Sequence, residues 1–270
     1  MNKNAPIGIF DSGIGGLTVA KAIRTLLPNE EIIYFGDTAH MPYGDKSQEL
    51  IQHYATKITH FLIEKHHCKT IVIACNTASA AAYEQLRDQF KGNIPIINVI
   101  DPMIEAVISD NEVHNVGIIA TKTTINANIY QEKLNRRKPS LSFAALATPL
   151  LASMIEDGFY NNNISKAVLE KYLSDESLDG IDSLILACTH YPLIKNEIDL
   201  FFNHKVKLFD SGLVVANKLA AILRNESLLA DHPSPNKNRF FVSDYTESFK
   251  YATKIFFDEE VALELQNIMD

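Results

Sequence analysis

Two cysteines end similar apolar runs, one in each half of the chain. Cys75 lies in IVIACNTAS (residues 71–79), and Cys188 lies in LILACTHYP (residues 184–192). A thiolate is a competent base and nucleophile, and a thiol close to a helix N-terminus ionises more readily. One thiol on each side of a substrate carbon can remove a proton from one face and return a proton to the other. Such a pair can invert a stereocentre.

Other polar residues near the two cysteines fit proton transfer and ligand binding. Asp11 and His190, one in each half, are of the types that act as general acids and bases. The remaining polar candidates are Ser12, Asn76, Thr77, Thr121, Thr124 and Thr189. These stretches contain no Arg, and Lys122 is their only Lys. We therefore expect hydroxyls, amides and backbone N–H groups at helix starts to hold a carboxylate substrate.

Each candidate also has a purely structural interpretation. A buried Cys at a strand end usually packs as a small apolar side chain, and a single Ala-Cys turn would favour that view. Two such turns in matching context favour a function instead. Ser12 and Asn76 can cap helices as well as bind. Cys68, in EKHHCKT, lacks a partner spacing for metal binding, so we expect it to pack only.

The elements needed to position these residues alternate between strand and helix. Apolar runs at 7–10, 70–74, 116–120 and 181–187 predict strands buried on both faces of a parallel sheet. Each run ends in a polar turn that opens a helix. Ligands of open α/β sheets bind at this edge. The loop DTAHMPYG is long for a strand-to-helix connection, which favours a functional role.

A second pair of similar stretches indicates two facing units. IGIFDSGIGG (residues 7–16) and KLFDSG (residues 207–212) each end an apolar run in Asp-Ser-Gly. We predict two pseudo-symmetric α/β domains with mostly parallel sheets and the active site in the cleft between them. Residues 1–98 and 208–270 would form a discontinuous first domain, and 99–207 the inserted second. In the tail we expect an edge strand at 239–243 and helices at 245–257 and 259–268.

The composition and net charge of the chain indicate which kinds of binding partner are unsuited to it. The 270 residues are 46 % apolar and 21 % charged, as in an ordinary globular protein, and the net charge is −8. This charge argues against nucleic acid or an anionic membrane as the main partner. No run approaches the ~18–20 apolar residues that cross a bilayer. The start of the chain lacks a signal-peptide profile, so we expect a cytoplasmic protein with reduced cysteines.

Six stretches together carry a family resemblance: FDSGIGG, GDTAHMPYG, ACNTAS, ATKTT, ACTHYP and the second FDSG. In these stretches and in their order, from about residue 7 to 257, the sequence strongly resembles the glutamate racemases, which belong to the cofactor-independent aspartate/glutamate racemases. The resemblance implies reversible interconversion of L- and D-glutamate, which supplies D-glutamate for bacterial peptidoglycan. It also implies two α/β domains and a homodimer. Only six residues precede the first predicted strand, so we do not expect the activation by a cell-wall precursor that is linked to an N-terminal extension.

The resemblance also assigns roles to single residues. Cys75 would deprotonate the D isomer and Cys188 the L isomer, with Asp11, His190 and Glu156 of MIEDG assisting. Substrate contacts would be Asp11, Ser12, Tyr43, Gly44, Asn76, Thr77, Thr121, Thr124, Thr189 and His190. No cofactor or metal is expected. The GIGG turn is not G-x-G-x-x-G, and the neighbouring Asp11 would repel a pyrophosphate. We expect the domains to close on the substrate and exclude water.

Other functions remain open on the sequence alone. Cys188 and His190 could form a thiol–imidazole pair for acyl transfer. A racemase acting on aspartate is a nearer rival. The chain could instead only bind an amino acid or a protein, as some glutamate racemases are said to bind DNA gyrase. A redox switch between Cys75 and Cys188 is a further possibility.

Overall fold

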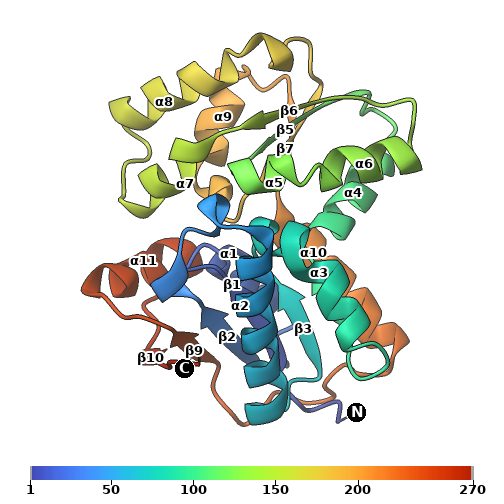
Figure 1. Ribbon diagram of the computed structural model, residues 1–270, viewed down its shortest axis with the longest axis vertical. Coiled ribbons are helices and arrows are strands. Elements are labelled where there is room, and N and C mark those ends of the chain that lie inside the picture. The colour runs from blue at the N-terminus through green and yellow to red at the C-terminus, as the bar shows by residue number, and fades with distance from the viewer. Residues whose placement is uncertain (1, 269–270) are drawn as a thin grey trace.

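The chain forms two parallel β-sheets with helices packed on their faces (Figure 1). The structure is a computed structural model that describes residues 2–268. One sheet has the strand order β10-β9-β2-β1-β3-β4 and the other has the order β6-β5-β7-β8. Neighbouring strands are parallel throughout both sheets. The predicted α/β class with two sheets is confirmed.

The six-stranded sheet draws on both ends of the chain. Its strands are β1 (Ile7–Asp11), β2 (Ile32–Gly36), β3 (Thr70–Ile73), β4 (Ile96–Asn98), β9 (Arg239–Val242) and β10 (Leu263–Leu265). The helices in these parts of the chain are α1 (Leu17–Leu26), α2 (Gln48–His60) with its π-helical end η3 (Phe61–Lys65), α3 (Asn76–Gln89), α10 (Ser211–Asn225) and α11 (Glu247–Phe257). Two 3₁₀ turns, η1 (Thr38–His40) and η2 (Tyr43–Asp45), follow β2.

The four-stranded sheet comes from the middle of the chain. Its strands are β5 (Asn115–Ala120), β6 (Ser142–Ala147), β7 (Ser183–Ala187) and β8 (Lys207–Phe209). The helices of this region are α4 (Ile100–Ile108), α5 (Lys122–Asn126), α6 (Ile129–Arg137), α7 (Pro149–Glu156), α8 (Asn163–Leu173) and α9 (Lys195–Phe201), with the 3₁₀ turns η4 (Glu176–Leu178) and η5 (Tyr191–Ile194). The predicted division at 99–207 stays a proposal, and β8 runs to Phe209, just past its end.

Burial explains why the central strands are apolar throughout. Every residue of β1, β2, β3 and β7 is buried. β1 lies between β2 and β3, with the registers Ile9↔Tyr34 and Ile9↔Val72. In a parallel sheet of this kind, helices cover both faces of the central strands. One core cluster of buried side chains contains residues of both sheets, among them Ile9 of β1 and Ile118 of β5. The two halves are therefore packed against each other through a shared core.

Two expectations for the end of the chain were wrong. Residues 239–242 form β9, which is not an edge strand, because β10 pairs with it. Part of the predicted helix at 259–268 is β10, in register with β9 at Leu263↔Phe240. Arg239 binds Glu264 through two hydrogen bonds of 2.9 and 2.5 Å, which link these strands across the sheet.

Within residues 2–268, no helix is long and apolar enough to cross a membrane. In the same part of the chain, no group of three or more His, Cys, Asp or Glu side chains is arranged to hold a metal ion.

Candidate active site between the sheets

The carboxyl ends of the central strands of both sheets meet at one small cavity. β1 and β3 lead into Ser12 and Cys75, while β5 and β7 lead into Thr121 and Cys188. The cavity has a volume of about 40 Å³. It is lined by Ser12, Met41, Pro42, Tyr43, Gly44, Cys75, Asn76, Thr77, Thr121, Ala152, Ser153, Glu156, Ala187, Cys188, Thr189 and His190. The two thiols therefore face one small cavity from opposite sheets.

Cys75 lies directly before α3 and acts as its N-cap. Its Sγ accepts a hydrogen bond from the backbone N–H of Ala78 at 3.4 Å and its S–H donates to Ser12 Oγ at 3.5 Å. Burial, with the nearby charge of Asp11, raises the pKa of the Cys75 thiol to about 12, against the weaker opposing effect of the two hydrogen bonds. At neutral pH this sulfur is therefore a thiol that can give up a proton.

Cys188 belongs to a chain of three polar side chains. Its Sγ lies 3.5 Å from His190 Nδ1, and His190 Nε2 lies 2.7 Å from Glu156 Oε1. Burial lowers the pKa of His190, but the contacts with Cys188 and Glu156 outweigh it and raise that pKa well above its usual value. The ring is then an imidazolium at neutral pH, and its Nδ1 lies within hydrogen-bond distance of the Cys188 sulfur. The two cysteines thus have opposite surroundings.

Asp11 lies behind the cavity and does not line it. Its Oδ2 accepts hydrogen bonds from the N–H groups of Gly13 at 3.1 Å and Gly16 at 3.0 Å. Its Oδ1 is buried and has no hydrogen-bond partner among the described residues. Burial raises the pKa of Asp11, although the positive His190 and the two backbone N–H groups oppose the effect. A buried, partly unpartnered carboxylate of this kind is suited to accept or pass on a proton.

Three threonine hydroxyls join the two halves beside the cavity. Thr77 Oγ1 lies 3.0 Å from Thr121 Oγ1 and 3.3 Å from Thr124 Oγ1, and the latter two are 3.0 Å apart. Thr121 also caps α5 through the N–H of Thr124. Thr124 is buried and is not among the lining residues, so it contacts the cavity only through its neighbours.

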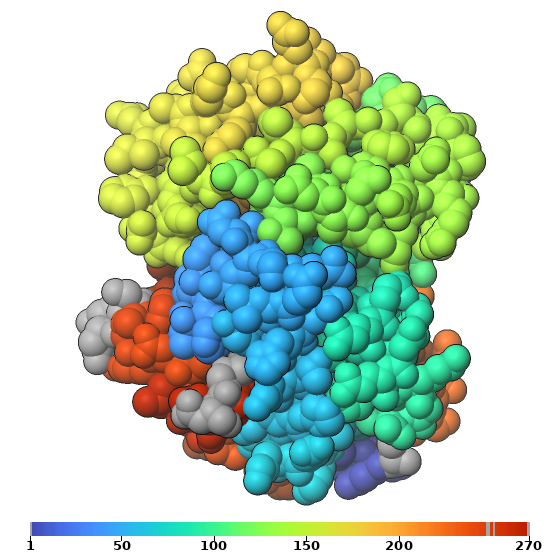
Figure 2. Space-filling model, viewed as in Figure 1, coloured from blue at the N-terminus to red at the C-terminus, as the bar shows by residue number. Residues whose placement is uncertain are grey.

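The loop after β2 forms one wall. Tyr43 donates its hydroxyl to Asp37 Oδ2 at 2.5 Å, and Asp37 Oδ1 lies 2.7 Å from both Ser243 Oγ and His40 Nδ1. The carbonyl of Gly44 accepts a hydrogen bond from Thr123 at 2.6 Å. In the face drawn in Figure 2, the blue atoms of this segment lie against the other half of the molecule. The loop of residues 37–44 is therefore hydrogen-bonded to Ser243 in one half of the molecule and to Thr123 in the other.

Several features of the site were not found by sequence reasoning. Met41 and Pro42 line the cavity and lie inside a loop that its length had marked as functional. Ala152 and Ser153 lie on α7, one turn before Glu156, and nothing in their sequence context points to the site. Asp37 was part of the same loop, but its role as a hydrogen-bond hub depends on Ser243, which is distant in sequence.

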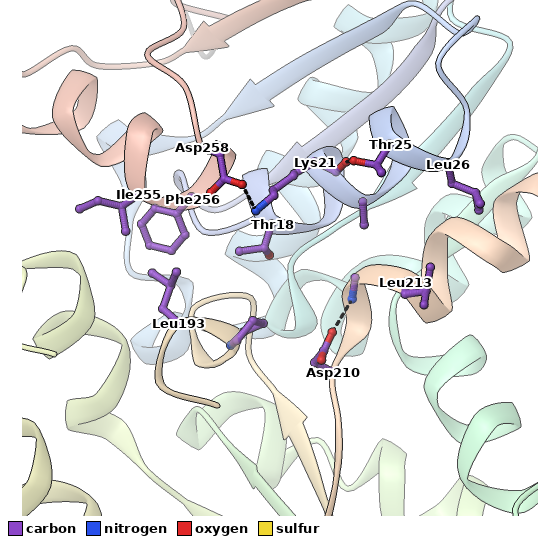
Figure 3. Close-up of a pocket in the computed structure, with 13 residues that line it drawn as sticks. Thr18, Lys21, Thr25, Leu26, Leu193, Asp210, Leu213, Ile255, Phe256 and Asp258 are labelled. Carbon is purple, nitrogen blue, oxygen red and sulfur yellow. Dashed lines mark hydrogen bonds and ion pairs between the residues drawn. The ribbon is translucent and has the colours of Figure 1, made fainter. Parts of the chain in front are cut away.

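The second Asp-Ser-Gly does not reach the cavity. Asp210 caps α10 by accepting from the N–H of Gly212 at 3.2 Å and pairs with Lys195 at 2.5 Å. It lines a separate pocket of about 420 Å³ together with Thr18, Lys21 and Phe256 (Figure 3). The similarity to the first Asp-Ser-Gly thus reflects helix capping here. Cys68 is also remote, and burial raises its pKa to about 12.

The larger pocket lies behind the turn that carries His190. Thr18, drawn in Figure 3, donates a hydrogen bond to the carbonyl of Thr189 at 3.1 Å. The ring of Phe256 meets the His190 ring nearly at right angles, with centroids 5.3 Å apart. The polar wall of this pocket consists mainly of paired groups, such as the Lys21–Asp258 ion pair. The pocket supports the His190 turn but holds no nucleophile of its own.

Comparison with known proteins identifies the class to which this fold and this pair of thiols belong. A sequence model of the Asp/Glu/Hydantoin racemase family matches residues 17–219, and the chain belongs to this family. The predicted resemblance is thereby confirmed, and the family's activity makes the chain an isomerase.

Its relatives within the family are more specific. A curated glutamate racemase from Neisseria meningitidis is 41 % identical over 251 residues, covering 93 % of this chain and 92 % of that protein. The crystal structure of glutamate racemase from Francisella tularensis in complex with D-glutamate has a TM-score of 0.91 at 40 % identity and covers 98 % of both chains. A glutamate racemase isoform from Bacillus anthracis has a TM-score of 0.91 at 33 % identity and covers 99 % of both chains.

Proposed function

We propose that the protein interconverts L- and D-glutamate by moving a proton at Cα between two thiols. The observation that carries this proposal is that Cys75 and Cys188 line one cavity from opposite sheets. A substrate carbon held between them presents one face to each sulfur. The cited relatives are glutamate racemases, and the Francisella tularensis protein binds D-glutamate, which supports glutamate as the substrate.

The resemblance to the family and the surroundings of the two cysteines support a direction for each step. From L-glutamate, the Cys188 thiolate beside the His190 imidazolium removes the Cα proton, and the Cys75 thiol donates its proton to the opposite face. The product is D-glutamate, and the sulfurs have exchanged protonation states. The reverse reaction starts from the Cys75 thiolate, with Asp11 as the nearby group that can take its proton. Each turnover conserves one proton and needs no electron acceptor.

The lining also suits an amino-acid dicarboxylate. It offers hydroxyls, an amide and backbone N–H groups, and the lining residues include no Lys or Arg. Exclusion of water from so small a cavity strengthens these interactions when charge develops at Cα. On this proposal, Ser12, Tyr43, Gly44, Asn76, Thr77, Thr121 and Thr189 contact the substrate, Thr124 supports Thr77 and Thr121, and no cofactor takes part.

The resemblance to the family supports three further proposals. The D-glutamate serves peptidoglycan synthesis, the protein acts in the cytoplasm, and it forms a homodimer. Sedimentation velocity of the purified protein tests the last of these directly. A single species with the mass of one chain at micromolar concentration would contradict it.

Proton exchange at Cα tests the two-thiol mechanism. Purified protein is incubated with L-glutamate in deuterium oxide while optical rotation and deuterium content are followed together. We expect deuterated D-glutamate from the wild type and its loss in both Cys75→Ser and Cys188→Ser. Cys68→Ser is the matched control, because Cys68 is as buried as the others but lies away from the cavity. If neither rotation nor Cα–H exchange changes with wild type, the glutamate assignment is wrong, and a parallel assay with aspartate follows.

One geometric feature supports a second candidate, acyl transfer by a single cysteine. The Cys188–His190–Glu156 chain has the order of nucleophile, base and orienting acid used by thiol hydrolases. Such an enzyme needs one thiol only. Full activity of Cys75→Ser on a thioester or ester substrate, without Cα exchange, would favour this candidate over racemisation.

A further inference from the structure

A buried tyrosine from one half of the molecule holds an amide of the other half at the cavity. Tyr130 lies in α6 and is 1 % exposed. Its hydroxyl donates a hydrogen bond of 2.7 Å to Oδ1 of Asn76, the first residue of α3. Asn76 lines the cavity beside Cys75. This contact therefore connects a residue outside the site with one inside it.

The hydrogen bond fixes which end of the Asn76 amide is free. With Oδ1 engaged by Tyr130, the remaining polar atom is Nδ2, which is buried and has no hydrogen-bond partner among the described residues. A buried N–H group without an acceptor is costly, so native structures rarely leave one unless a ligand or water completes it. The free end of this amide is a donor, and a carboxylate oxygen is its natural acceptor.

The hydroxyl of Tyr130 is suited to remain a donor. Burial raises its pKa far above the usual value, with smaller effects from the charges of Asp101 and Cys188. The phenol is therefore neutral at physiological pH and keeps its proton to donate. A freely rotating amide would present Oδ1 to the cavity part of the time, and that oxygen would repel a carboxylate.

We propose that Tyr130 is a positioning residue that orients the Asn76 amide so that Nδ2 donates to a carboxylate group of the substrate. This inference rests on the proposed racemisation of glutamate. It assigns Tyr130 no contact with the reacting atoms, because its hydroxyl is used by Asn76.

A double-mutant cycle tests the inference through steady-state kinetics in both directions. The variants are Tyr130→Phe, Asn76→Ala and the double variant, with Tyr172→Phe as the control. Tyr172 is a half-buried tyrosine whose hydroxyl accepts from the N–H of Leu150 at 3.3 Å, away from the cavity. Tyr130→Phe keeps the ring and removes only the hydroxyl, and thermal unfolding of each variant checks that the fold is retained.

The expected result is a split between the two kinetic constants. In Tyr130→Phe the Asn76 side chain is free to rotate and must be ordered again when substrate binds. We therefore expect KM to rise about 3- to 10-fold in both directions, with kcat nearly unchanged. In the Asn76→Ala background, Tyr130→Phe should change KM no further, because the group it orients is gone. Tyr172→Phe should leave KM and kcat unchanged.

Two results would overturn the inference, and they are distinct. If wild type racemises glutamate but Tyr130→Phe has equal effects in both backgrounds, or lowers only thermal stability, then Tyr130 is structural and the proposed function stands. If wild type does not exchange the Cα proton of glutamate, the proposed function fails, and the role of Tyr130 falls with it.

Discussion

At the scale of single residues, the two cysteines differ more in their surroundings than in their sequence context. Both end a buried strand at Ala-Cys, yet Cys75 contacts a neutral hydroxyl while Cys188 contacts an imidazole paired with Glu156. On the proposed mechanism, this asymmetry suits Cys75 as the proton donor and Cys188 as the proton acceptor for L-glutamate. A two-base racemase needs these states before L-glutamate can react, and the reverse reaction needs them exchanged.

Glu156 should set the pH range of the L-to-D reaction. Its hydrogen bond and charge raise the pKa of His190, so Glu156→Gln lowers that pKa. The imidazolium is then lost at a lower pH, and the alkaline limb of kcat/KM for L-glutamate moves toward neutral pH. We expect a loss of about 100-fold at the alkaline end, at the lower end of the ~10²–10⁴-fold range that general acid–base catalysis contributes.

The pH–rate profile of Glu156→Gln is compared with that of Asp157→Asn. Asp157 is the next acid in the chain, but it is exposed and follows the end of α7. Its variant should keep the wild-type profile. An unshifted alkaline limb in Glu156→Gln would show that Glu156 does not control the protonation of His190.

The types of many site residues could be predicted from the sequence, but the contacts between them could not. The Cys, His, Asn and Thr candidates stand in the sequence directly after apolar runs, so their place at a strand end could be predicted. Glu156 had no such context and came from the resemblance alone. The contacts Tyr130–Asn76 and Asp37–Ser243 join residues that are far apart in the chain. A hydrogen bond of that kind depends on side-chain direction, which periodicity does not define.

At the scale of elements, the turn between β1 and α1 packs closely against the His190 turn. A Cβ at Gly15 would lie 2.5 Å from His190 Cε1 and 2.7 Å from Thr189 Oγ1. Real Cβ atoms do not approach this closely, so Gly15→Ala must displace the imidazole or the turn. Overpacking of this kind costs about 1–3 kcal/mol of stability, and a shift of about 1 Å at a reacting group can cost about 100-fold in rate.

We therefore expect Gly15→Ala to lose racemisation far more than stability. Gly212→Ala is the matched control from the second Asp-Ser-Gly, where the added Cβ would meet its nearest atom at an ordinary 3.5 Å. Rates of racemisation and thermal unfolding are measured for both variants. Wild-type activity in Gly15→Ala would show that the two turns can separate without affecting His190.

Element type was predictable where the pattern was long and failed where elements were short. The strands that lead into Cys75 and Cys188 are continuous apolar runs, and their helices follow directly. The segment around β10 was predicted as helix because its alternation is brief. What makes it a strand is pairing with β9, including the Arg239–Glu264 contact. Tertiary pairing of this sort overrides a weak local pattern.

At the scale of the whole molecule, the cavity is smaller than its proposed substrate. A volume of about 40 Å³ has room for only a few water molecules, since a cavity needs about 10–15 Å³ of such volume to hold one. Contacts between the halves close it from two sides: Thr123 with the Gly44 carbonyl at 2.6 Å, and Thr18 with the Thr189 carbonyl at 3.1 Å. We therefore expect the two sheets to move apart when substrate enters or leaves.

Solution scattering should detect this motion. We expect the radius of gyration to fall when saturating glutamate is added, toward the value of about 18 Å for a compact monomer of this length or the corresponding dimer value. D-Alanine at the same concentration is the control, because it lacks the second carboxylate needed to engage both halves. Thr123→Val, which removes one closing hydrogen bond, should require more glutamate for the same change. Scattering profiles that are identical with and without glutamate would contradict closure, and entry would then have to occur through movement of the segment from η1 to η2 alone.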